Sequence, residues 1–339
     1  MNARTCQSCS TDISPLIDSF GRKVTYLRLS ITDRCNLRCR YCMPEDGVNV
    51  LDHKSILSYE EMERLSRIFV SLGVNKIRIT GGEPFVRKGC LEFMERLKEQ
   101  SPGLSLHLTT NGVAVGPYLQ GLKELGIKGI NLSLDTLDAE RFKEITRRDK
   151  LEKVLAVFHE ILRLELPLKV NAVVQEDTGD DELLRMAQLV KDYPVAMRFI
   201  ELMPFSGAEE HHVIEMSQTL ESRLFKLFPG LTELSSKHVE TARKFSLPGY
   251  AGTLGIIEGE SRKFCATCNK LRVTSSGMMK NCLYDQGALN LRDLLRATPD
   301  DSEVAGEIRK AVSKKLKNGM EAAKLNGNSS EDSMASIGG

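Results

Sequence analysis

The feature that most constrains the fold is an alternation of strand-like and helix-like segments from residue 24 to residue 199. Short β-branched runs alternate there with longer segments whose apolar residues recur at helical spacing. The expected strands begin at Val24, Val74, Leu104, Ile127, Leu166 and Val195. This alternation predicts an α/β fold with a parallel sheet. Periodicity alone is compatible with an open, doubly wound sheet and with a sheet that curls into a barrel.

Local signals predict where one expected helix begins and where two expected helices end. Ser58 is followed by Glu61 in SYEEMERL, which is the pattern of a capping box at a helix start. Gly73 and Gly126 each follow a helical pattern. Glycine commonly ends a helix because it adopts the left-handed conformation without steric cost.

Beyond about residue 205 the alternation stops, and we expect a second domain. FSGAEEHHV indicates a loop, QTLESRLFKLF indicates a helix, and a glycine-rich run follows. The closing stretch NGNSSEDSMASIGG lacks the apolar content to fold alone. The expected division is an N-terminal extension (1–20), a partial barrel (21–210), a C-terminal domain (211–325) and a tail (326–339).

Two trios of cysteines flank the body of the chain. The first is Cys35, Cys39 and Cys42, and the second is Cys265, Cys268 and Cys282. A cubane iron–sulfur cluster usually takes four thiolates, so three leave one iron open to bind a reactant. The first trio follows an expected strand and therefore lies at the edge where parallel sheets bind ligands. A zinc site there would need a fourth ligand, for which His53 is the local candidate.

The charge balance and the hydropathy argue against two classes of partner. The chain has 47 Lys and Arg against 46 Asp and Glu, which favours neither a polyanion surface nor a nucleic-acid partner. No apolar run reaches membrane-spanning length, and MNARTCQSCSTD has no apolar signal core. We therefore expect no membrane partner and a cytoplasmic location, where the nine cysteines are metal ligands or free thiols.

CNLRCRYC, followed by Gly81-Gly82-Glu83-Pro84 after an expected strand, resembles the radical S-adenosylmethionine superfamily. The resemblance implies a [4Fe-4S] cluster that binds and reductively cleaves S-adenosylmethionine to a 5′-deoxyadenosyl radical. Gly81 and Gly82 would let the backbone approach the methionyl group. Alone, GGEP would equally indicate a tight turn between a strand and a helix.

The second trio, the block KIRITGGEP and the final Gly338-Gly339 narrow the resemblance to the GTP 3′,8-cyclases of molybdenum cofactor biosynthesis. This implies an incomplete (β/α)6 TIM-type barrel whose open side is closed by a C-terminal iron–sulfur cluster domain. It also implies a second [4Fe-4S] cluster that binds the guanine of GTP. The implied lyase reaction converts GTP to (8S)-3′,8-cyclo-7,8-dihydroguanosine 5′-triphosphate.

The residues at the family's motif positions carry the implied contacts. S-adenosylmethionine would be bound by Tyr41, Gly82, Ser133 and Met203, and GTP by Arg28, Arg78, Thr109, Lys169, Lys270 and Arg272. Catalytic roles would fall to Arg28, Arg272, Gly338 and Gly339. Basic side chains on separate strands agree with a triphosphate pocket, for which Arg198 is a further candidate. Lys270 stands where the family usually has arginine, which replaces a planar two-pronged donor by a point charge.

Further partners follow from the same resemblance, and two alternatives remain. The partners are a reductant for the cluster and a downstream cyclic pyranopterin monophosphate synthase, and a homodimer is compatible with the sequence. One alternative is a radical enzyme that matures a peptide. The other is a non-catalytic zinc or iron–sulfur binding module. Cys6 and Cys9 form a CxxC outside the resemblance, and on composition alone the final glycines indicate disorder.

Overall fold

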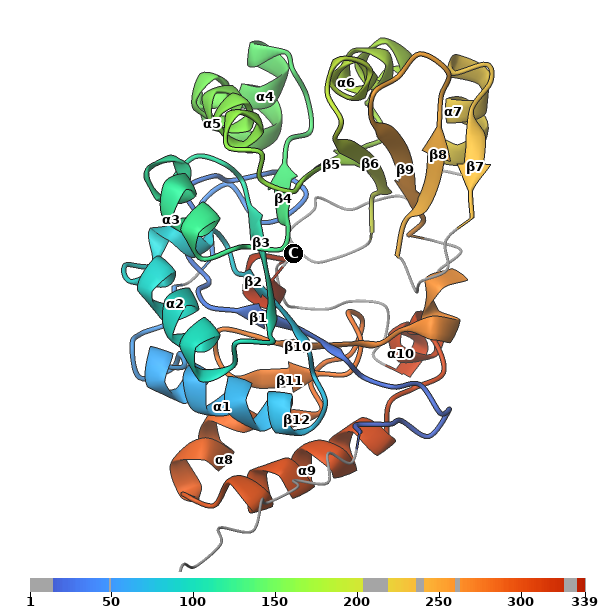
Figure 1. Cartoon of the computed structure of the whole chain (residues 1–339). Helices are drawn as coiled ribbons and strands as arrows, with labels where there is room; N and C mark the ends of the chain where they lie inside the picture. The colour runs from blue at the N-terminus through green and yellow to red at the C-terminus, as the bar shows by residue number, and fades with distance from the viewer. Residues whose placement is uncertain are drawn as a thin grey trace, which may run out of the picture.

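The computed structural model describes residues 15–48, 50–203, 219–235, 241–259, 263–325 and 334–338. Figure 1 shows a sheet that curves round the centre of the molecule, with α1 to α6 on its outer side. The described C-terminal end lies at that centre. None of the helices within these ranges is long and apolar enough to cross a membrane.

The described strands form one sheet in the order β12-β11-β10-β1-β2-β3-β4-β5-β6-β9-β8-β7. Their bounds are β1 Tyr26–Ser30, β2 Lys76–Thr80, β3 Ser105–Thr110, β4 Ile130–Ser133, β5 Leu168–Val174, β6 Ala196–Glu201, β7 Thr232–Leu234, β8 Arg243–Ser246, β9 Thr253–Ile257, β10 Lys270–Val273, β11 Met278–Lys280 and β12 Leu289–Asn290. From β10 through β1 to β6 and β9 all neighbours pair in parallel. The α/β prediction is confirmed, and each expected strand is present.

Helices cover the outer face of the parallel strands. The helices are α1 Tyr59–Ser71, α2 Cys90–Gln100, α3 Leu119–Glu124, α4 Ala139–Thr146, α5 Leu151–Arg163, α6 Asp180–Asp192, α7 Leu220–Leu227, α8 Leu291–Ala297, α9 Asp301–Ser313, α10 Gly319–Leu325 and α11 Met334–Ile337, with single 3₁₀ turns at Pro84–Val86, Gly116–Tyr118 and Lys263–Thr267. Ser58 and Glu61 form the predicted capping box of α1. Gly73 and Gly126 follow α1 and α3 with φ of 95° and 69°, as predicted for helix-ending glycines.

The segment after residue 205 extends the same sheet at both edges. β9 pairs with β6, and β10 pairs with β1, so this segment reaches the two ends of the parallel part. The helix expected in QTLESRLFKLF is α7, whereas all of FSGAEEHHV lies outside the described residues. The glycine-rich run holds β9, which its composition had not predicted. A Cβ at Gly252 would lie 2.1 Å from the carbonyl oxygen of Val195, so glycine lets this strand approach its neighbour.

The strands place apolar and polar residues on opposite faces of the sheet. In β1, Leu27 and Leu29 are fully buried in the core beneath the helices. Tyr26 and Arg28 alternate with them and line a cavity on the inner face. The same alternation in neighbouring strands makes the inner face polar, which is unusual for a packed core and marks this face as the site.

Candidate functional site

A single cavity of about 590 Å³ gathers nearly all the residues predicted from the sequence. Its lining includes both cysteine trios, Tyr41, Gly82, Ser133, Met203, Arg28, Arg78, Thr109, Lys169, Lys270, Arg272 and Arg198. Gly338 contacts two of these side chains. Gly339, Cys6 and Cys9 lie outside the described residues.

The first trio occupies the loop that leaves the carboxyl end of β1. The sulfur of Cys35 accepts hydrogen bonds from the backbone of Leu37 at 3.4 Å and from Asn111 Nδ2 at 3.6 Å. Burial raises the pKa of Cys42 to about 12, and the nearby Cys35 adds to the rise. Burial also raises the pKa of Cys39 well above its usual range. Such thiols lose their protons only beside a compensating cation, a role that iron would fill.

The glycine pair of GGEP packs directly against this loop. The backbone N–H of Gly82 donates to the carbonyl of Thr32 at 2.8 Å, and that of Glu83 donates to Arg34 at 2.8 Å. A Cβ on Gly82 would lie 2.3 Å from the carbonyl oxygen of Arg34, and one on Gly81 would lie 2.7 Å from that of Thr32. The cysteine loop therefore requires glycine at both positions, and the approach of a methionyl group to them stays a prediction.

Glu83 is a buried residue of the site to which the sequence had assigned no role. Its carboxylate accepts hydrogen bonds from Thr110 Oγ1 at 2.9 Å and from the backbone of Asn111 at 2.7 Å. Burial raises the pKa of Glu83 to about 7 in spite of these bonds. Because Asn111 also contacts Cys35, Glu83 fixes a side chain next to the first trio. Its place in the GGEP motif was the available signal.

Tyr41 is held in the cavity by a carboxyl group that sequence reasoning missed. Its hydroxyl donates to Asp135 Oδ2 at 2.8 Å. The other carboxyl oxygen of Asp135 accepts from the backbone of Val173 at 2.8 Å. Burial raises the pKa of Asp135 to about 6. A polar residue just past the end of β4 was the signal, because ligand-binding residues gather at that edge.

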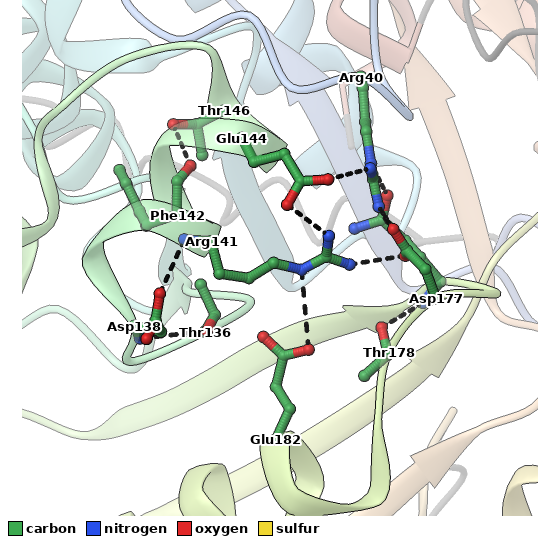
Figure 2. Close-up of polar contacts among 11 residues, drawn as sticks. Arg40, Thr136, Asp138, Arg141, Phe142, Glu144, Thr146, Asp177, Thr178 and Glu182 are labelled. Carbon is green, nitrogen blue, oxygen red and sulfur yellow. Dashed lines mark hydrogen bonds and ion pairs between the residues drawn. The ribbon is translucent and has the colours of Figure 1, made fainter.

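Arg40, between Cys39 and Tyr41, ties the cysteine loop to the outside of the sheet (Figure 2). It donates to Gln175 at 2.6 Å, Glu144 at 3.0 Å and Asp177 at 2.6 Å. Arg141 of α4 binds the same two carboxylates at 2.7 and 2.6 Å. Two arginines thus share two carboxylates, which fixes the loop against α4 and the β5–α6 connection.

The second trio lies in an electropositive part of the same cavity. Cys265 sits in the 3₁₀ turn before β10, and its carbonyl accepts from the backbone N–H of Cys268 at 3.1 Å. Burial alone would raise the pKa of Cys268, but the charges of Lys315 and Lys270 outweigh it and lower this pKa. Positive surroundings that stabilise a thiolate suit a ligand of a cluster.

The donor sets of both trios fit iron–sulfur clusters. Within the described ranges, no three or more His, Cys, Asp or Glu side chains close around a single metal ion. A cubane cluster makes a different demand, because it spreads its thiolates over several irons. Three thiols from each trio on the wall of one cavity meet that demand.

Basic side chains from several strands converge at the β10–β1–β2 side of the cavity. The guanidinium of Arg78 donates to the hydroxyl of Tyr26 at 2.7 Å and to the carbonyl of Leu108 at 2.6 Å. Burial, reinforced by the charge of Arg28, lowers the pKa of Arg272 to about 9. The crowded cations create a field that attracts a polyanion. Tyr26 was not predicted as a site residue.

The described C-terminal residues contact both the first cysteine trio and the basic side chains of the cavity. The carbonyl of Gly338 accepts from Arg272 Nη1 at 2.9 Å and from Arg28 Nη2 at 3.3 Å. The backbone N–H of Ala335 donates to the sulfur of Cys42. Ile337 is 1% exposed, so the described residues 334–338 pack into the body of the protein, although the composition of this stretch would not let it fold alone.

Two family descriptions match the chain. Residues 29–190 match the Radical SAM superfamily, and residues 195–320 match Molybdenum Cofactor Synthesis C. Together they cover all of the sheet except the first three residues of β1, both cysteine trios and α8 and α9.

Several curated proteins are similar over most of this length. The mitochondrial GTP 3′,8-cyclase of Arabidopsis thaliana is 40% identical over 88% of this chain and 77% of its own length. The GTP 3′,8-cyclase of Heliobacterium modesticaldum is 39% identical over 88% of this chain and 93% of its own. Molybdenum cofactor biosynthesis protein 1 of Homo sapiens is 39% identical, and the chain spans about half, 48%, of that longer relative.

Solved structures share the fold at low sequence identity. SuiB of Streptococcus suis bound to S-adenosylmethionine has a TM-score of 0.60 and 15% identity, over 93% of this chain and 76% of that one. The anSMEcpe structure with bound AdoMet has a TM-score of 0.57 and 18% identity, over 88% and 83%. These likenesses support the curved, partly closed parallel sheet.

Proposed function

The chain belongs to the GTP 3′,8-cyclase family of radical S-adenosylmethionine enzymes, and we propose that it converts GTP to (8S)-3′,8-cyclo-7,8-dihydroguanosine 5′-triphosphate. This is the first step of molybdenum cofactor biosynthesis. The observation that carries the proposal is the one cavity lined by both cysteine trios and by cations from separate strands. Radical initiation and substrate binding thereby share one enclosed space, as a reactive radical requires.

The first trio and its neighbours form the radical-generating part of the site. Cys35, Cys39 and Cys42 hold a [4Fe-4S] cluster, which together with S-adenosylmethionine supplies a radical that abstracts hydrogen. Tyr41, Gly82, Ser133 and Met203 contact S-adenosylmethionine. The hydrogen bond from Tyr41 to Asp135 supports this assignment, because it holds the tyrosine ring in the cavity.

The basic side chains and the second trio form the substrate part of the site. Arg28, Arg78, Thr109, Lys169, Lys270 and Arg272 would bind GTP, and Cys265, Cys268 and Cys282 would hold a second cluster with an iron open to the guanine. The positive field around the cavity supports a triphosphate ligand. Arg28 and Arg272 also bind Gly338, so the tail and the substrate share these arginines.

The C-terminal segment closes the open side of the partial barrel. The addition of β9 and β10 to opposite ends of the parallel strands supports this role. The domain division is a partial barrel over 21–210 and a cluster domain over 211–325. Partners are a reductant for the first cluster and a cyclic pyranopterin monophosphate synthase that consumes the product.

The test is an anaerobic reaction of reconstituted protein with S-adenosylmethionine, a strong reductant and either GTP or ATP. The amounts of 5′-deoxyadenosine and of cyclised nucleotide are measured. Stimulation by GTP alone, with a new cyclised nucleotide, would support the proposal. Cleavage that is indifferent to the nucleotide would redirect the search to peptide substrates. No cleavage by protein with full iron and sulfide content would overturn the radical assignment.

A further inference from the structure

Tyr26 lies at the centre of the basic side chains, where an aromatic residue has no obvious packing role. It begins β1, is 7% exposed and lines the cavity. In the sheet it is the register partner of Lys76 on β2 and of Lys270 on β10. The side chains of these three residues therefore stand side by side on the inner face.

Both neighbouring ammonium groups lie over the ring of Tyr26. Lys76 Nζ is 4.6 Å from the ring centroid, and Lys270 Nζ is 5.8 Å from it. These distances are within the range of cation–π attraction, about 6 Å. The flexible stem of a lysine has many rotamers, so a ring on its neighbour is an effective means of fixing its ammonium group.

The phenol oxygen of Tyr26 binds the guanidinium groups as well. Arg78 Nε donates to it at 2.7 Å, and Arg28 also hydrogen bonds to the Tyr26 side chain. Tyr26 thus contacts cations on three adjacent strands through its ring and its oxygen.

The charges that line the cavity explain why a residue that contacts several cations is needed. Among the described lining residues are eight Lys and Arg side chains against the two carboxylates of Asp135 and Glu201. Burial opposes ionisation of Tyr26, but the charges of Arg78, Arg28 and Lys76 outweigh it and lower the pKa of Tyr26 to about 7. An electron-rich phenol is therefore a shared partner of Arg78, Arg28 and Lys76 before a substrate arrives.

We propose that Tyr26 is a positioning residue of the substrate site, which orients Arg28, Lys76, Arg78 and Lys270 to receive the triphosphate of GTP. This inference rests on the proposed function. Lys270 occupies the position where the family usually has arginine. The inference gives this lysine a partner, because the ring of Tyr26 restrains its ammonium group. A guanidinium fork would need less restraint, since its donors are already fixed in a plane.

The groups that face Tyr26 allow a pH signature to be assigned. They are Arg28 on its own strand, Lys76 and Arg78 on β2, and Lys270 and Arg272 on β10. His107 on β3 contacts Arg78, but burial and the charge of Arg78 lower the pKa of His107 to about 3. Tyr26, whose pKa is lowered to about 7, is therefore the group to which we assign a pH signature near neutral pH.

The test compares GTP kinetics of the reconstituted wild type, Tyr26→Phe and Tyr118→Phe between pH 6 and 8. Tyr118 is exposed, its ring contacts that of Phe85 in a tilted arrangement, and it is outside the cavity lining, so its variant is a matched control. Tyr26→Phe should raise KM for GTP about tenfold, as loss of a charge-assisted hydrogen bond does, and leave kcat within about twofold. The ratio of variant to wild-type KM should also change across this pH range, because only the wild type has the titrating phenol.

Each outcome separates this inference from the proposed function. A KM ratio that is raised equally at every pH would assign Tyr26 a merely structural role and overturn the inference. A KM like that of the wild type, or a variant that fails to fold or to load iron, would overturn it too. A wild type that gives no GTP-dependent product would instead overturn the proposed function. Cleavage of S-adenosylmethionine without GTP should be the same in the wild type and in Tyr118→Phe, whose ring lies outside the cavity lining.

Discussion

Arg272 on β10 donates a hydrogen bond from Nη1 to the carbonyl oxygen of Gly338 at 2.9 Å. Arg28 on β1 reaches the same oxygen at 3.3 Å. Two arginines of the proposed GTP site are thereby joined by one carbonyl of the tail. The tail is part of the site in this arrangement, and its conformation depends on a residue without a side chain.

Gly338→Ala should greatly reduce formation of the cyclised nucleotide. Gly338 has a φ of 83°, and an added Cβ would lie 2.5 Å from Thr80 Oγ1. The left-handed conformation alone costs an L-residue about 1–2 kcal/mol, so product formation should fall by about 5- to 30-fold or more. Gly306→Ala is the control, because a Cβ on Gly306 meets nothing within 4 Å. Equal activity of the two variants would show that the tail is dispensable.

Gly82→Ala should dislodge the first cluster and spare the second. An added Cβ would lie 2.3 Å from the carbonyl oxygen of Arg34, next to Cys35, so the cysteine loop must move. The reconstituted variant should lose about half of its iron, as expected when one of two [4Fe-4S] clusters is missing. Gly103→Ala serves as the control, since its Cβ meets no atom within 4 Å. Full iron content in Gly82→Ala would contradict the claim that the packing of Gly82 against the cysteine loop leaves no room for a side chain.

Single cysteine substitutions should separate the two trios by function. Cys39→Ala removes a ligand of the first cluster and should abolish cleavage of S-adenosylmethionine. Cys268→Ala should leave some cleavage but lose the cyclised product. Both are measured as 5′-deoxyadenosine and cyclised nucleotide in the same anaerobic assay. Normal product from Cys268→Ala would show that the second trio is not needed.

Glu83 should make the protein less stable as the pH rises towards 8. Burial raises its pKa from 4.5 to about 7, so the folded state holds a proton that the unfolded state has released. This contribution is fully present below pH 4.5 and is lost as the pH rises through 7, for a total on the order of 3 kcal/mol. Denaturant unfolding of cluster-free wild type and Glu83→Gln at pH 5 and 8 measures it. The same pH dependence of the free energy of unfolding in both proteins would contradict the raised pKa of Glu83.

Arg40→Ala should loosen the cysteine loop with only a small loss of global stability. The ion pairs of Arg40 are partly exposed, its partner Asp177 by 48%, so solvent screening limits the loss to about 0.5–1 kcal/mol. Iron should leave the first cluster faster on exposure to air, because the cysteine loop loses the contacts of Arg40 with α4 and the β5–α6 connection. Arg163→Ala, which breaks the exposed pair with Glu160, is the control. An equal rate of iron loss in both variants would contradict the claim that Arg40 holds the cysteine loop in place.

The sequence determined six strands of the parallel sheet and the start of one helix, because local patterns specify them. Alternating apolar runs indicated six strands of the parallel sheet, and Ser58 with Glu61 indicated the start of α1. The spacing of Cys35, Cys39 and Cys42, followed by GGEP, identified the superfamily. These signals lie within a few residues of one another, so no tertiary contact is needed to recognise them.

Only the tertiary structure decided which distant residues meet. β9 and β10 pair with β6 and β1, a choice that depends on the curvature of the whole sheet. The contacts of Asp135 with Tyr41 and of Tyr26 with Lys270 join residues far apart in the chain. Their neighbours in the sequence carry no trace of these pairs, because a pair across strands depends on register and on the face to which each side chain points.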